Sequence, residues 1–256
     1  MRVLVAAARA QFQMTVRNLG SDLFNLVTVP FFAVVFIAIV KQSGRSSLIA
    51  YAVMAPVMIA LWQMAIFVAG ELINRDRWGG LLEAVIATPA PFALVMVGRI
   101  GTICAFGLVG FAESWLVAQI VFGVTVPIPH PEVLLATLVC AAFACTGTAL
   151  VFSALFSLRE SARVFQNSIS YPFYLLGGIL VPVSYLPWWL QPASRVIFLS
   201  WTAELLRDSL RPAPLVAVPQ RLAVVLLLGF TGLLVGWFLL HRIIDRLRHE
   251  GTIGLA

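Results

Sequence analysis

The sequence predicts an all-α, polytopic membrane protein, and three observations support this fold class. The 256 residues are 61% hydrophobic and 11% charged, and their mean hydropathy is +0.98. A soluble domain of this length would be about half apolar and about a quarter charged. The apolar residues also gather in runs that are each long enough to cross a hydrocarbon core about 30 Å thick.

Residues 1–20 predict an amphipathic helix that lies along the membrane surface. At about 100° per residue, one narrow sector collects the polar side chains, namely Arg2, Arg9, Gln13 and Arg17. The adjacent sector is apolar and carries Val5, Ala8, Phe12, Val16 and Leu19. A helix with two such faces binds at the boundary between water and lipid. The stretch does not have the pattern of a signal peptide.

Six transmembrane helices are expected to follow. The predicted spans are Leu23–Val40, Leu48–Gly70, Phe92–Val124, Val133–Leu158, Val164–Val183 and Leu222–Leu240. The third is too long for a simple crossing, so we expect its first turns, with Arg99, to project into the cytosol. No soluble domain or internal repeat is visible, and the chain is predicted to form a single transmembrane domain.

The distribution of cationic residues predicts that both ends of the chain face the cytosol. With the ends inside, eleven Lys and Arg residues lie on the cytoplasmic side and six lie outside. The positive-inside rule favours this orientation, although four of the outer arginines lie in the long loop before the last span. The formal charge of +6 is thus interpreted as a sign of topology and anionic lipid contact, not of nucleic-acid binding.

Residues 184–212 predict short re-entrant or interfacial helices at the outer surface. This loop holds the aromatic residues typical of a membrane-interface belt, Tyr185, Trp188, Trp189 and Trp201. It also holds two pairs of opposite charge at a spacing of three residues, Glu204 with Arg207 and Asp208 with Arg211. On a helix, such pairs are expected to form ion pairs.

Motifs for catalysis are missing from the sequence. It contains no H-E-x-x-H or G-x-S-x-G pattern, and its three histidines, His130, His241 and His249, lie in predicted loops or tails. The cysteines, Cys104, Cys140 and Cys145, lie in apolar runs without metal-ligand spacing, as small packed residues do. The only lysine, Lys41, is not part of a P-loop, so ATP would have to be bound by a partner. We expect no catalytic residue, metal or cofactor in this chain.

Two polar features inside the predicted spans are candidates for a translocation path. Glu113 is the only acidic residue deep in an apolar run, and such a residue is a functional hypothesis by default. The fifth span begins with polar side chains, Gln166, Asn167, Ser170 and Tyr171. These residues could line a path for substrate. Alternatively, Glu113 could be a structural residue facing the bundle interior, and the fifth-span residues could make ordinary interhelical hydrogen bonds.

The charged stretch at residues 71–91 predicts a docking loop on the cytoplasmic side. Glu71 closes the second span, and Arg75-Asp76-Arg77 follows about one turn later. Gly79-Gly80 permits a sharp turn, after which residues 81–86 can form a short helix that Pro89 ends. This geometry suits binding of a soluble partner. An ordinary solvated turn is the alternative.

The same stretch resembles a motif in the membrane subunits of type-2 ABC exporters, the ABC-2 permeases. The matching positions are Glu71, Arg75, Asp76, Arg77, Gly79, Gly80, Glu83, Thr88 and Pro89, with Gly80 in place of the usual Thr or Ser. A second family pattern matches at Gly178, Pro182, Leu186, Pro187, Trp189, Leu190 and Leu206-Arg207. Phe198-Leu199-Ser200 departs from it, because family members often carry Asn-Pro there.

The resemblance implies a specific assembly and mechanism. Two such subunits, identical or different, would form a pore in a bacterial cell membrane, and each would dock on a separate ATPase subunit that binds ATP and Mg²⁺. Residues 71–91 would couple nucleotide hydrolysis to the pore. Pro182, Leu186, Pro187, Trp189 and Arg207 would shape the outer gate.

The expected function is export of amphipathic small molecules, as in permeases of the daunorubicin-resistance type. Export of lipid or polysaccharide by the same mechanism is the alternative. From another class, a membrane assembly protein without transport activity is also considered, and an intramembrane enzyme is disfavoured by the missing motifs.

Overall fold

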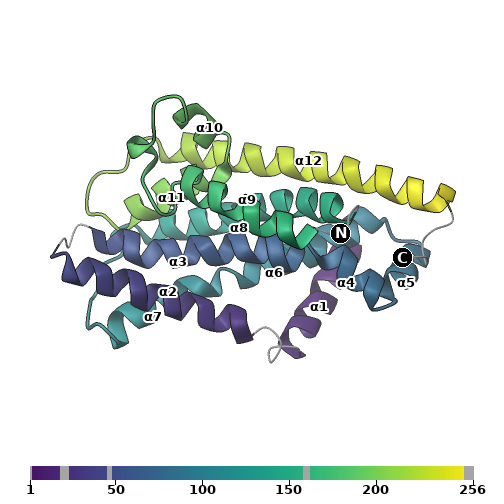
Figure 1. The fold of residues 1–256 in the computed structure, drawn as a ribbon, viewed down its shortest axis with the longest axis horizontal. Coiled ribbons are helices and arrows are strands. Elements are labelled where there is room, and N and C mark those ends of the chain that lie inside the picture. The colour runs from purple at the N-terminus through teal and green to yellow at the C-terminus, as the bar shows by residue number, and fades with distance from the viewer. Residues whose placement is uncertain (1, 18–22, 45–47, 158–161, 251–256) are drawn as a thin grey trace.

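The computed structural model describes residues 2–17, 23–44, 48–157 and 162–250 of the chain (Figure 1). All regular elements within these ranges are helices, as the sequence predicts. The elements before the long outer loop are α1 (Arg2–Arg17), α2 (Leu23–Gln42), α3 (Ile49–Gln63), the π-helical η2 (Met64–Ala69), α4 (Leu72–Trp78), α5 (Leu81–Ala87), α6 (Phe92–Phe106), α7 (Val109–Ile120), α8 (Pro131–Phe156) and α9 (Ala162–Leu176). The rest are the 3₁₀ turn η3 (Val183–Tyr185), α10 (Gln191–Arg195), α11 (Phe198–Ser209) and α12 (Val218–Glu250).

Four helical stretches in the described ranges are long and apolar enough to cross a membrane. They are Ile49–Trp78, Phe92–Ile120, Pro131–Phe156 and Val218–Ile243. They coincide with the second, third, fourth and sixth predicted spans. The first predicted span falls in α2, whose apolar stretch from Val27 to Gln42 is shorter.

The fifth predicted span ends earlier than the sequence indicated. Helix α9 stops at Leu176 instead of continuing to Val183, and its 15 residues reach about 22 Å. Gly178 follows in a left-handed conformation, with φ at +66°. The Ser194 hydroxyl and the Arg207 guanidinium donate to the carbonyls of Leu176 and Gly178, respectively. These side chains from the outer loop satisfy the end of the helix, so it does not need to continue.

The third predicted span is broken at Gly107 and Leu108. After the break, the Phe111 amide donates to the Leu108 carbonyl over 3.0 Å. This bond spans three residues instead of four, so the chain makes a tight turn between α6 and α7. A Cβ at position 107 would lie 3.1 Å from the Leu61 side chain, so glycine favours this close approach to α3. Arg99, which the sequence places in turns that project into the cytosol, has its side chain buried among the helices beside Asp76 of α4.

Helices α8 and α12 form the longest contact in the bundle (Figure 1). Gly229, Gly232 and Gly236 let α12 approach the backbone of α8. A Cβ on Gly232 would lie only 3.0 Å from the Gly147 carbonyl carbon. The small residues thus serve packing within one chain.

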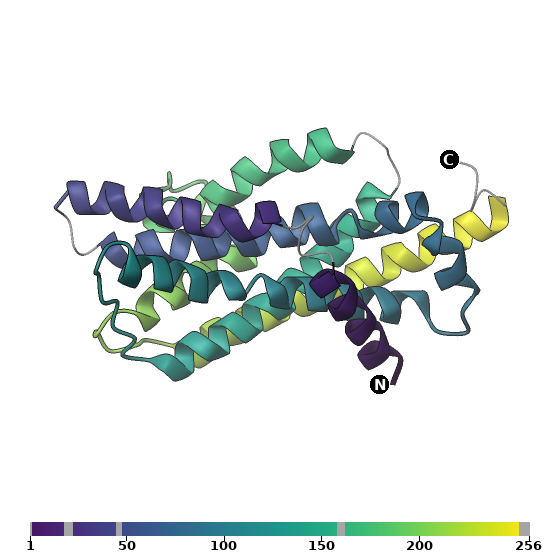
Figure 2. The same ribbon diagram turned by 90° about the horizontal axis from the view of Figure 1, so that it is seen from below.

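The two predicted loops lie at opposite ends of the bundle. Figure 1 places α4 and α5 at one end and α10 and α11 at the other. Helix α1 crosses the bundle at a steep angle near the end that carries α4 (Figure 2). Residues 71–91 and 184–212 therefore lie far apart, as the prediction of loops on opposite sides of the membrane requires.

Helix α1 has the two expected faces and a third, buried face that was not predicted. Arg2, Arg9 and the predicted apolar residues Val5 and Phe12 are exposed. Ala7 and Gln11 are buried, and a Cβ on Gly98 of α6 would lie 3.1 Å from the Ala7 Cβ. This narrow face holds α1 against α6, and Phe12 of the apolar face also stacks on Phe106 of α6 at a ring-centroid distance of 5.4 Å.

Candidate functional site

Two short helices and the turn between them make up the predicted docking loop. Helix α4 continues the direction of α3 and η2 and ends at Trp78. Gly80 adopts a left-handed conformation with φ at +68°, which redirects the chain into α5. The Thr88 hydroxyl donates to the Val85 carbonyl over 2.7 Å at the end of α5, and Pro89 follows. The predicted short helix ending before Pro89 is therefore present.

Most of the predicted coupling residues lie on the exposed side of this loop. The exposed members of the set are Arg75, Gly79, Gly80, Glu83, Thr88 and Pro89, while Glu71 is half-buried. Trp78 is 63% exposed and Leu81 is 45% exposed beside them. Trp78 was not among the predicted docking residues, although an exposed aromatic residue between charged side chains is a typical anchor for a partner protein.

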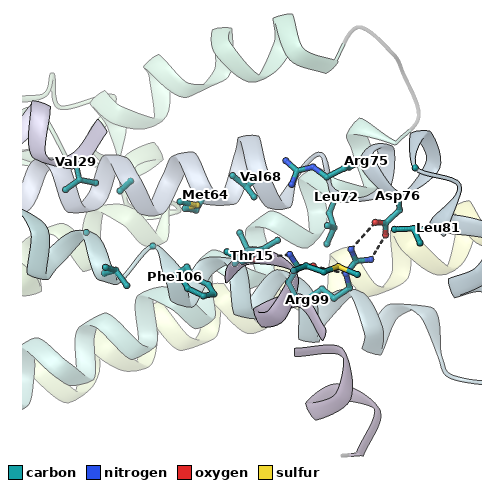
Figure 3. A pocket seen from close by; sticks show the side chains of 18 of the residues that line it. Thr15, Val29, Met64, Val68, Leu72, Arg75, Asp76, Leu81, Arg99 and Phe106 are labelled. Carbon is teal, nitrogen blue, oxygen red and sulfur yellow. Dashed lines mark hydrogen bonds and ion pairs between the residues drawn. The ribbon is translucent and has the colours of Figure 1, made fainter. Parts of the chain in front are cut away.

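Asp76 faces inward and does not belong to this surface. It is 2% exposed, and both of its carboxylate oxygens accept hydrogen bonds from the Arg99 guanidinium (Figure 3). The Arg99 Nε donates to the Gln11 side chain over 3.0 Å. Three segments, α1, α4 and α6, therefore meet at one buried ion pair. Sequence reasoning missed this pair because its members lie on different helices.

Two further α4 side chains cap the C-terminal end of α8. The Asn74 amide donates to the Phe156 carbonyl over 3.1 Å, and Arg77 donates to the Ser157 carbonyl over 3.4 Å. The last carbonyls of a helix form its negative end, which attracts hydrogen-bond donors and cations. Arg77, placed by sequence among the docking residues, thus contacts α8.

A cavity of about 430 Å³ lies between α1, α2, α6, α7 and the continuous stretch from α3 to α4 (Figure 3). Most of its wall is apolar, with contributions from Val29, Ala60, Met64, Val68, Ile103, Phe106 and Val109. Its polar lining includes Gln11, Thr15, Arg75, the Asp76–Arg99 pair and Glu113. The volume is in the range typical of small-molecule sites.

The residues predicted to line one translocation path lie on two sides of α3. Ala60 and Met64 of the α3–η2 stretch face the cavity that contains Glu113. Trp62 faces α9, where its Nε1 donates to the Ser170 hydroxyl over 3.3 Å. The structure therefore separates Glu113 from the fifth-span residues.

Helix α9 has one face against Trp62 and one face that no described element covers. Gln166 is fully buried, and its amide has no hydrogen-bond partner among the described residues. Phe173 stacks on Trp62 at a ring-centroid distance of 4.3 Å. On the other face, Asn167 is exposed and Tyr171 is 74% exposed.

At the outer end, the ion pairs differ from those predicted. Glu204 pairs with Arg195 at 2.9 Å and with Arg221 at 3.4 Å, and Asp208 pairs with Arg221 at 2.8 Å. The predicted pairs of Glu204 with Arg207 and of Asp208 with Arg211 do not form. The observed pairs connect α11 to α10 and to the first turn of α12, which local spacing could not indicate.

Arg207 instead enters the bundle and caps α9. Its guanidinium lies 4.2 Å from the ring centroid of Tyr51 and donates to the Gly178 carbonyl. Burial lowers the pKa of Arg207, and the neighbouring Tyr51 and Glu204 oppose that shift. Of the other predicted gate residues, Leu186 is buried, Pro182 is half-buried, and Pro187 and Trp189 are exposed.

The sequence profile of the ABC-2 type transporter family matches residues 2–210. This range contains α1 to α11, and therefore the docking loop, the cavity and the outer ion pair of Arg195 with Glu204. The chain belongs to the ABC-2 type transporter family. No curated protein matches the chain in a sequence comparison.

Membership in the ABC-2 family defines the general role of the protein. The ABC-2 membrane domain is the transmembrane component of an ABC transporter and lacks an ATPase site of its own. The chain is therefore a multi-pass permease subunit, and the family implies an ABC ATPase as its partner.

Proposed function

We propose that this ABC-2 permease exports amphipathic small molecules such as drugs across a bacterial cell membrane, as one of two permease subunits around a shared pore. The uncovered face of α9 carries the proposal. Among its described side chains, residues 166–176, α9 has amide, hydroxyl, phenol and aliphatic groups but no charged group. Polar side chains in a span face protein or water instead of lipid. An uncharged, partly aromatic wall suits a cargo that is itself amphipathic.

An ATPase subunit with its bound ATP and Mg²⁺ would dock on α4 and α5. The exposed side chains Arg75, Trp78 and Glu83 offer an aromatic anchor between charges of both signs. The loop is tied to the spans by α4 itself, which is continuous with α3, by the Asp76–Arg99 pair to α6, and by Arg77 to α8. A push on α5 would therefore be transmitted to three spans together.

The chain between the end of α9 and α11 would form the outer gate of the pore. Pro182, Leu186, Pro187 and Trp189 lie between the end of α9 and α10, and Arg207 holds that end against α11. Motion of α9 would therefore move the turn that closes the pore on the outside.

The test is drug transport in proteoliposomes that contain the permease and the ABC ATPase with which it co-purifies. We expect ATP-dependent accumulation of a fluorescent anthracycline. Arg75→Glu should abolish drug-stimulated ATP hydrolysis and lower transport at least about tenfold, because it reverses the charge of an exposed docking side chain. Arg77 is a poorer choice because it contacts α8.

Arg211→Glu, at the opposite end of the molecule, is the matched control and should leave both activities unchanged. Unaltered transport by Arg75→Glu would contradict docking on α4 and α5. ATP-dependent movement of a lipid or polysaccharide without movement of the drug would contradict the proposed cargo. A permease that retains no ATPase in mild detergent would contradict transport by this chain.

A further inference from the structure

Glu113 is an acidic residue in a membrane helix without a protein partner. It lies in the second turn of α7 and lines the 430 Å³ cavity. It makes no hydrogen bond or ion pair with any residue that the structure describes. Arg99 is already bound by Asp76, and it lies roughly 20 Å from Glu113 along the α6–α7 axis. An ionised carboxylate in such a place is costly unless something else brings a positive charge.

The cavity beside Glu113 is bordered by an interruption in a membrane-spanning helix. The break at Gly107 and Leu108 comes one to two turns before Glu113, and Gly107 and Gly110 both line the cavity. Interrupted spans are typical of ligand sites near the middle of the bilayer, because the break opens space and frees backbone groups. A Cβ at Gly110 would lie 3.2 Å from Val29, so the helices approach closely next to the cavity.

From these observations we infer that the cavity is a binding site for an organic cation with an apolar body, with Glu113 as its counter-ion. The site lies within one permease subunit, on the other side of α3 from the α9 face. It does not depend on the proposed export function.

The residues that line the cavity account for both the apolar body and the positive charge of the proposed ligand. Met64, Val68 and Phe106 offer apolar and aromatic contact for the body, and the half-buried Glu113 offers a carboxylate for the cation. A thioether and an aromatic ring are also favourable contacts for a large, polarisable cation. A small hydrated cation would leave the apolar wall unused, and a neutral molecule would leave the Glu113 charge unpaired.

The experiment measures equilibrium binding of tetraphenylphosphonium to the full-length permease in lipid nanodiscs. The matched probe is tetraphenylborate, which has nearly the same size and shape but the opposite charge. We expect saturable tetraphenylphosphonium binding with one site per chain, weakened at least about tenfold by Glu113→Gln, because the charge that pairs with it is removed. Glu113→Asp should retain part of the affinity.

Two further variants separate the site from general effects. Val109→Trp should also weaken binding, because Val109 is exposed on the cavity wall and a larger side chain would fill the space. Glu132→Gln, at an exposed position in the first turn of α8, should leave binding unchanged. Each variant is compared with the parent by size-exclusion profile and thermal unfolding.

Equal affinity of the parent and Glu113→Gln for tetraphenylphosphonium would overturn the inference. Tighter binding of tetraphenylborate, lost in Arg75→Gln, would overturn it too, because the cavity would then accept anions at its Arg75 end. If tetraphenylphosphonium binds and Glu113→Gln weakens that binding, but drug transport fails, the cation site is supported and only the export function is rejected.

Discussion

Two buried arginines near opposite ends of the molecule are held in different ways. Arg99 is 7% exposed and forms a bidentate ion pair with Asp76, so its charge is neutralised by a carboxylate. Arg207 is 4% exposed, but its guanidinium binds backbone carbonyls of the α9 terminus and lies over the Tyr51 ring. The first arrangement joins three helices through a charge pair, whereas the second uses a cation as a helix cap.

The difference predicts different responses to mutation. A buried ion pair contributes little net stability, yet it is costly to break because one charge is then left without a partner. A cap made to neutral carbonyls leaves only dipoles unsatisfied when it is lost. Asp76 should therefore be the more sensitive position, although its helix α4 has 7 residues and α11, which carries Arg207, has 12.

The largest effect is expected from Asp76→Ala. The change leaves the buried Arg99 charge without its carboxylate partner, and we therefore expect a loss of about 3–5 kcal/mol in the free energy of unfolding. Chemical unfolding in mixed micelles measures it. The double variant Asp76→Leu with Arg99→Met removes both charges and should lie much closer to the parent. A double variant as unstable as Asp76→Ala would show that packing, and not the stranded charge, is responsible.

A smaller effect is expected from Arg207→Met. The apolar side chain keeps the packing against Tyr51 but leaves the Gly178 carbonyl without its donor, at a cost of about 1–3 kcal/mol in the same unfolding assay. Arg207→Lys retains the cation and should recover part of this loss. If Arg207→Met were as destabilising as Asp76→Ala, the contrast between the two arginines would fail.

The smallest effect is expected from Arg221→Gln. Arg221 pairs with Glu204 and Asp208 at the outer surface, where its side chain is 15% exposed and the two carboxylates are more exposed. Such pairs contribute about 0.2–1 kcal/mol, and salt screens them. The cost should therefore shrink as NaCl is raised from low to high concentration. If the loss in free energy of unfolding did not change with salt, the Arg221 ion pairs would behave as a buried pair, like Arg99 with Asp76.

Part of the candidate site could be predicted from sequence because its signals are local. The turn at Gly80, the short helix before Pro89 and the exposure of Arg75 and Glu83 all follow from residues close together in the chain. The inward orientation of Asp76 could not be predicted, since it depends on where α6 and α1 place Arg99 and Gln11. The separation of Glu113 from Ser170 likewise depends on which faces of α3 they meet.

The sequence by itself determined the fold class, the amphipathic first helix, four of the spans and the positions of both loops. The physical reason is that bilayer thickness sets the length of each apolar run and that the positive-inside rule places Lys and Arg in the segments between runs. Both patterns are formed by consecutive residues, so they can be recognised in the sequence. Only the tertiary structure decided the end of α9, the break before Val109, and the partners of Arg99, Arg207 and Glu204. These features depend on contacts between distant segments, where a buried polar group takes whichever partner the packed helices bring within reach.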